Sequence, residues 1–114
     1  MNHQKLFCYG RLLETARRMP DLIERLPRGT YYIVDQLNRA LSSAILNLCE
    51  GNERTSQKER NRFFDISLGS ISEVAGAIQF IAAYRYISEI EEHEILEELR
   101  IIYCMVRKLK KSII

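Results

Sequence analysis

Apolar side chains recur every three or four residues along most of this sequence, and that spacing constrains the fold more than any other feature. A period near 3.5 places side chains on one stripe of an α-helix, whereas a strand needs alternation at every second residue. The two prolines, Pro20 and Pro27, both precede residue 30. The pattern therefore predicts an all-α protein whose helices bury their apolar stripes against one another.

Two stripes occupy the first half of the chain. The first comprises Leu6, Tyr9, Leu13, Ala16 and Ile23. Pro20 stands where a further core residue is expected, and because proline lacks a backbone N–H it should kink or split this helix. Thr30 is the expected N-cap of the second helix, which should end near Gly51. The second stripe comprises Val34, Leu37, Leu41, Ala44 and Leu48.

The two later stripes each follow a capping-box pattern, Ser56 with Glu59 and Ser88 with Glu91. The third stripe comprises Phe64, Ser67, Ile71, Val74, Ile78 and Ile81. The fourth comprises Ile95, Leu99, Ile102, Val106, Leu109 and Ile113. Both patterns predict long helices that begin at a serine.

The connections between the expected helices fall at 27–30, 51–56 and 85–88. Connections this short leave no room for a long crossover, so consecutive helices should pack antiparallel. The 114 residues are enough for one core and too few for two. We therefore expect residues 1–114 to form a single domain, an up-and-down antiparallel four-helix bundle.

A polar motif spans the end of the second expected helix and the start of the third. It consists of Arg39-Ala40, Ser43, Asn47, Glu50-Gly51, Arg54, Ser56, Lys58-Glu59, Arg62-Phe63, Gly69-Ser70 and Glu73. In order and spacing it resembles the motif of the 23S rRNA intervening-sequence proteins, a family of four-helix bundles. Arg60 and Asn61 depart from that family, which commonly has apolar residues at these positions.

The resemblance implies a homo-oligomer, notably a pentamer, and implies no enzymatic activity. A related group, the accessory variability determinants of diversity-generating retroelements, binds nucleic acid and a reverse transcriptase. The chain looks closer to the first group because of the segment NLCEG at 47–51. The family name records a location within ribosomal RNA genes.

No catalytic, metal-binding or cofactor-binding set can be assembled from the sequence. Cys8, Cys49 and Cys104 are odd in number and widely spaced, so we interpret them as small core residues. His3 and His93 lack a second ligand at helical spacing. Ser70 lacks the surroundings of a nucleophile elbow. We expect Gly69, Ser72 and Gly76 instead to let another helix approach closely, and we expect the protein not to be an enzyme.

The sequence also predicts neither a membrane span nor a signal peptide. No apolar run approaches the roughly 20 residues that cross a bilayer, and the N-terminus lacks a basic segment followed by an apolar block. The cytoplasm is the expected compartment.

Polar side chains at the second turn suggest a structural network. Helix ends leave backbone groups unpaired, and Asn47, Glu50 and Arg54 are placed to satisfy them. We expect these three residues to tie the turn together.

The net charge is only +2, but its distribution along the fourth helix is uneven, with glutamates early and cations late. This order also suits the helix dipole, so ordinary helix stabilisation is one interpretation. Alternating helices would nevertheless gather cations at one pole of the bundle. The predicted cluster is Lys5, Arg11, Arg54, Lys58, Arg60, Arg107, Lys108, Lys110 and Lys111. At the other pole, Arg17, Arg18, Arg25 and Arg28 should face glutamates.

This cationic pole, repeated around an oligomer, favours binding of RNA or DNA without strong sequence specificity. The alternative is an interaction scaffold that binds a partner protein, with Tyr31, Tyr32, Tyr84 and Tyr86 as candidate contacts. The sequence leaves both hypotheses open.

Overall fold

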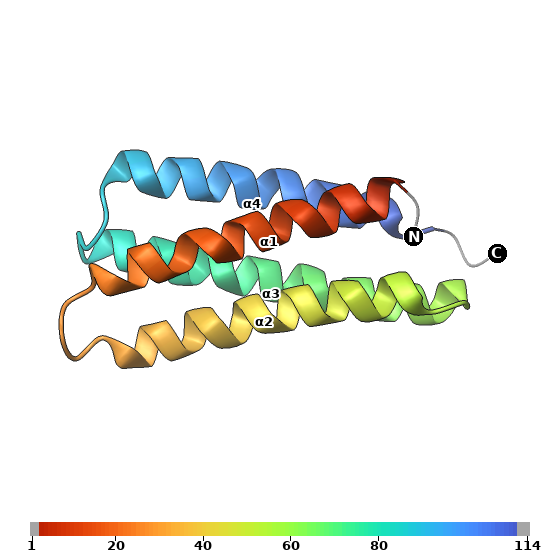
Figure 1. The fold of residues 1–114 in the computed structure, drawn as a ribbon, viewed down its shortest axis with the longest axis horizontal. Helices are drawn as coiled ribbons and strands as arrows, with labels where there is room; N and C mark the ends of the chain where they lie inside the picture. Colours follow the sequence, from red (N-terminus) through yellow and green to blue (C-terminus); the bar gives the residue numbers. More distant parts are fainter. Residues whose placement is uncertain (1–2, 112–114) are drawn as a thin grey trace.

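The computed structural model describes residues 3–111 of the chain. Within that range lie α1 (His3–Glu24), α2 (Tyr31–Glu53), α3 (Gln57–Ala83) and α4 (Glu89–Leu109), and there is no strand. Consecutive helices run antiparallel and side by side, and α1 also packs against α4 (Figure 1). The bundle measures 49 × 23 × 20 Å. The predicted all-α, up-and-down antiparallel four-helix bundle is confirmed.

The core consists of one apolar stripe from each helix. For α3, the whole predicted set is buried. For α4, the same holds for all members except Ile113, which lies outside the described residues. In α2 the predicted set is buried apart from Val34, which is half-buried, and Ile33 and Ala40 join the core. The 3.5-residue period therefore located the buried face of three helices.

The stripe predicted for α1 was wrong by about one position. The buried side chains are Cys8, Leu12, Thr15, Met19 and Leu22. Leu6 is 55% exposed, and the other members of the predicted stripe are half-buried. A polar residue in the true stripe explains the error: Thr15 is buried because its Oγ1 donates a hydrogen bond to the Arg11 carbonyl at 3.1 Å.

Pro20 does not split α1, contrary to that expectation. The helix continues through it to Glu24, and Pro20 itself is exposed. Proline removes one backbone hydrogen bond. Only one further turn follows, and burial of Met19 and Leu22 holds that turn on the core.

The two serine caps are confirmed. Ser56 Oγ accepts a hydrogen bond from the Glu59 N–H, and Ser88 Oγ accepts one from the Glu91 N–H, both at 3.1 Å. The glutamate side chains do not close the boxes. Each pairs with an arginine instead, Glu59 with Arg62 and Glu91 with Arg25.

The start and end of α2 differ in detail from the prediction. Thr30 occupies the N-cap position, but its Oγ1 donates to the Pro27 carbonyl at 2.6 Å and caps no helix N–H. The helix also continues past Gly51 to Glu53. Gly51 is therefore a helical residue, and its role lies in packing.

The end of α3 has the hydrogen bonds of a Schellman motif. The Arg85 N–H bonds to the Ala82 carbonyl at 2.9 Å, and the Tyr86 N–H bonds to the Ile81 carbonyl at 3.1 Å. Arg85 adopts φ 62°, the left-handed conformation that glycine usually supplies at this position. The motif turns the chain sharply into α4.

Among the described residues, α3 is long and apolar enough, by length and composition alone, to cross a membrane. That is weak evidence for a span, since the core helix of a water-soluble bundle passes the same test. The buried side of α3 packs against α2 and α4.

Candidate nucleic-acid interface

The start of α1, the α2–α3 turn and the end of α4 meet at one end of the bundle (Figure 1). Two of the predicted cations there influence a third: burial, and then the charges of Arg60 and Lys111, lower the pKa of Lys5. These residues come from three separate segments. We use the name basic end for the cations gathered here: Lys5, Arg54, Lys58, Arg60, Arg62, Arg107, Lys108, Lys110 and Lys111.

Some cations of the basic end are neutralised by nearby carboxylates. Arg54 pairs with Glu50 at 2.8 Å, and Lys110 pairs with Asp65 at 2.6 Å. Four others are exposed and form no ion pair with a described residue: Lys58, Arg107, Lys108 and Lys111. Their ammonium and guanidinium groups are open to a ligand.

Arg60 and Asn61 hold the basic end together. Arg60 Nε donates a hydrogen bond to the Arg54 carbonyl at 2.6 Å, which braces the α2–α3 turn. Asn61 Nδ2 donates to the Lys111 carbonyl at 2.8 Å, and Asn61 Oδ1 accepts from the Lys111 N–H at 3.3 Å. The paired bonds fasten the segment after α4 to the start of α3. The polar side chains at 60 and 61 thus fix where the C-terminal cations lie.

The motif residues beside the α2–α3 turn pack closely against one another. A Cβ at Gly51 would lie 2.6 Å from Cε1 of Phe64, which is fully buried. Glycine therefore allows the Phe64 ring to press against α2. Next to it, the guanidinium carbons of Arg54 and Arg62 lie 5.0 and 4.7 Å from the centre of the Phe63 ring, within range of cation–π attraction.

The expected network of Asn47, Glu50 and Arg54 exists only in part. Glu50 and Arg54 form an exposed pair one turn apart. Asn47 Nδ2 instead donates to the Ser43 carbonyl at 2.8 Å and to Ser43 Oγ at 3.2 Å. Ser43 Oγ in turn lies 2.7 Å from Ser70 Oγ on α3. The serine and asparagine positions of the motif thus link α2 to α3 some distance from the turn.

The other motif positions on α3 face outward. Gly69 and Glu73 are exposed, as are Ser72 and Gly76. A Cβ at either glycine would meet nothing within 4 Å. The expected close approach of a helix at these glycines does not occur within the described chain.

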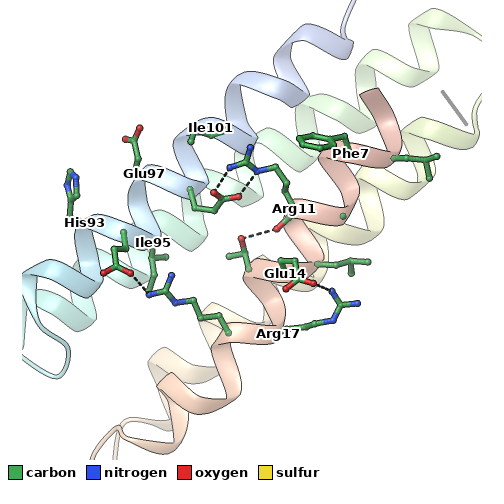
Figure 2. A pocket seen from close by; sticks show the side chains of 15 residues that line it. Phe7, Arg11, Glu14, Arg17, His93, Ile95, Glu97 and Ile101 are labelled. Atoms are coloured by element: carbon green, nitrogen blue, oxygen red, sulfur yellow. Dashed lines mark hydrogen bonds and ion pairs between the residues drawn. The ribbon is translucent and has the colours of Figure 1, made fainter. Parts of the chain in front are cut away.

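Arg11 lines a groove between α1 and α4 of about 990 Å³ (Figure 2). Its Nε and Nη2 bond to the two carboxylate oxygens of Glu98 at 2.8 and 2.6 Å. These hydrogen bonds to Glu98 raise the pKa of Arg11, and the two side chains satisfy each other. Arg11, predicted among the cations of the pole, is therefore neutralised by Glu98 and adds no unpaired charge there.

At the opposite end the expected charge compensation is present for two of the four arginines. Arg18 pairs with Glu94 at 3.1 Å and Arg25 with Glu91 at 2.6 Å. The hydrogen bond from Arg25 lowers the pKa of Glu91. Arg17 instead pairs with Glu14 on its own helix, and Arg28 forms no ion pair with a described residue.

The thiols occupy three different environments. Cys8 is a core residue as expected, and burial raises its pKa to about 11, which keeps the thiol protonated. Cys49 is half-buried and Cys104 is exposed, so these two were wrongly assigned to the core. Within residues 3–111, no group of three or more His, Cys, Asp or Glu side chains is arranged to hold a metal ion.

Comparison with known proteins agrees with the motif and the fold. A search of curated proteins gives no match. Residues 4–108 match the family described as 23S rRNA-intervening sequence protein, so the match covers all but the ends of the chain. The chain therefore belongs to the 23S rRNA-intervening sequence protein family.

Proposed function

We propose that this protein is a non-enzymatic, cytoplasmic homo-oligomer that binds RNA or DNA through the basic end, without strong sequence specificity. The observation that carries the proposal is the position of Lys58, Arg107, Lys108 and Lys111. They come from two helices and the segment after α4, they share one end of the bundle, and no described carboxylate neutralises them. Such a surface attracts phosphate groups, and copies of it in an oligomer add their fields.

Low sequence specificity follows from the type of contact. Three of these four cations are lysines, whose long side chains meet phosphates as point charges. Phosphate contacts position a nucleic acid but carry no base information. The ribose and base edges are then read only where other side chains reach them.

A salt series with a structured RNA tests this proposal. We expect retardation in a gel or a rise in fluorescence anisotropy at about 50 mM salt, with log Kd changing linearly with log salt concentration because bound counterions are released. Several RNAs of unrelated sequence should bind with similar affinity. Absence of binding at low salt would contradict the proposal.

The outer face of α3 supports the oligomeric part of the proposal. Gly69, Ser72 and Gly76 are exposed there, and each helical glycine costs about 1 kcal/mol relative to alanine. A second copy packed on this face would offset that cost, since small residues allow close approach. We expect light scattering to give a mass that is a multiple of 13.4 kDa. The family resemblance implies a multiple of five. A mass of one chain would contradict it.

A second candidate function is that of an interaction scaffold, and an aromatic cluster at the opposite end favours it. Phe80 stacks on Tyr84 with ring centres 4.6 Å apart, and Tyr32 meets Phe80 edge-on at 6.1 Å. Tyr31 and Tyr84 are 79% and 55% exposed. Exposed aromatic side chains are typical of protein interfaces. Co-purification of one stoichiometric protein, without RNA, would favour the scaffold.

A further inference from the structure

We propose that a pocket on the basic end holds an unpaired nucleobase, with Phe7 as the surface on which the base stacks. The inference rests on the proposed function and deepens it by naming the part of the nucleic acid that the site prefers. It concerns single-stranded RNA or DNA, or the unpaired loop of a structured RNA.

The pocket lies between the first turns of α1 and the last turn of α4. Its volume is about 260 Å³, and it is lined by His3, Gln4, Phe7, Met105, Lys108 and Leu109. Pockets for drug-sized ligands hold roughly 300–1,000 Å³. This one therefore suits a single planar ring system, with an apolar lining from Phe7, Met105 and Leu109 and polar groups from His3 and Gln4.

Phe7 is free to stack. Phe7 is 53% exposed on the surface of α1. Its ring centre lies 6.0 Å from that of His3, and the two ring planes are tilted by 37°. On the same ring, the Arg11 guanidinium carbon is 6.0 Å from the centre. Every base has a π-face, so stacking on such a ring tolerates any sequence, as phosphate contact does.

The charges around the pocket favour a polyanion. Lys108 lines it, and Arg107 and Lys111 belong to the same basic end. Phe7 also lines the larger α1–α4 groove (Figure 2). The arginines that line that groove, Arg11, Arg17 and Arg18, are each paired with a glutamate, so the groove offers a phosphate no unpaired arginine, whereas Lys108 in the pocket pairs with no described carboxylate. A strand bound at the basic end would therefore place a base against Phe7 and keep its backbone near the lysines.

Fluorescence anisotropy with a labelled 12-nucleotide single strand and a blunt duplex of the same sequence tests the pocket. We expect Phe7→Ala to weaken binding of the single strand about 5- to 100-fold, the range that loss of one stacked base produces. Binding of the duplex should stay within about twofold, because its bases are paired and only its phosphates are available. Phe7→Tyr should retain the wild-type affinity, since it keeps the ring.

Leu6→Ala is the matched control, because Leu6 is 55% exposed on the same helix and lines the groove but not the pocket. It should leave both affinities unchanged. Equal loss for single strand and duplex, or no loss for either while the duplex still binds, would overturn the pocket and leave the proposed function standing. A fall in oligomer mass with unchanged RNA affinity would also overturn it, by showing that Phe7 contacts protein. Failure of the wild-type protein to bind either probe would overturn both proposals.

Discussion

Replacing Gly51 by alanine is expected to destabilise the protein by about 1–3 kcal/mol, the usual cost of forcing an extra methyl group into a packed core. The new Cβ would lie 2.6 and 2.7 Å from two atoms of the Phe64 ring and 3.3 Å from Cβ of Phe63. Phe64 is fully buried, so its ring sits among other core side chains. The clash outweighs the gain of roughly 1 kcal/mol that alanine brings to a helix interior. Thermal unfolding followed by circular dichroism would show a lower Tm, by about 4 °C per kcal/mol.

Gly10→Ala supplies the control, since Gly10 is also helical and a Cβ there meets nothing within 4 Å. We expect it to raise stability by about 0.5–1 kcal/mol. The two substitutions are chemically identical and should have opposite signs. Equal shifts, or stabilisation by Gly51→Ala, would show that the α2–α3 contact is looser than the structure describes.

The number of helices and most of the core followed from the sequence because burial is periodic. The residues predicted for three of the four stripes are all apolar except Ser67, and their period fixed the buried face. The α1 stripe includes Thr15, which hydropathy alone does not rank as a core residue. Local hydrogen bonding made Thr15 a core residue, and that bond depends on the helix already being present.

Topology located most of the candidate interface, because alternating helices must place the chain ends and the middle turn together. Topology could not reveal individual ion pairs. Arg11 is eight residues from the start of α1 and reaches Glu98, whereas Lys108 finds no described carboxylate. The pocket beside Phe7 was missed for a similar reason. No periodic signal marks an exposed aromatic residue. The topology could, however, have placed Phe7 at the same end of the bundle as the cations that end α4.

The turn motif also acquires a physical meaning that spacing alone did not provide. Gly51 admits Phe64, Ser43 and Ser70 meet across the helix pair, and the arginines flank Phe63. These contacts set the register of α2 against α3. They therefore fix the start of α3, which carries Lys58, and the Lys58 side chain takes no part in these contacts.

Removing four charges from the basic end is expected to reduce RNA affinity on the order of 100-fold at about 50 mM salt. The slope of log Kd against log salt concentration should fall by about 3, because each lost phosphate contact contributes roughly 0.7–0.9 to it. The variant carries glutamine at the four unpaired cations: Lys58, Arg107, Lys108 and Lys111. All four side chains are exposed, so the fold should be retained.

The matched control removes four charges elsewhere, with glutamine at Arg17, Arg28, Arg39 and Arg100. It has the same net charge as the basic-end variant, and the ion pairs that it loses are exposed ones, which contribute little to stability. If affinity depends on where the cations lie, the control should keep most of the wild-type affinity and the full salt slope. Equal losses in the two variants would mean that overall charge, and not the basic end, attracts the nucleic acid.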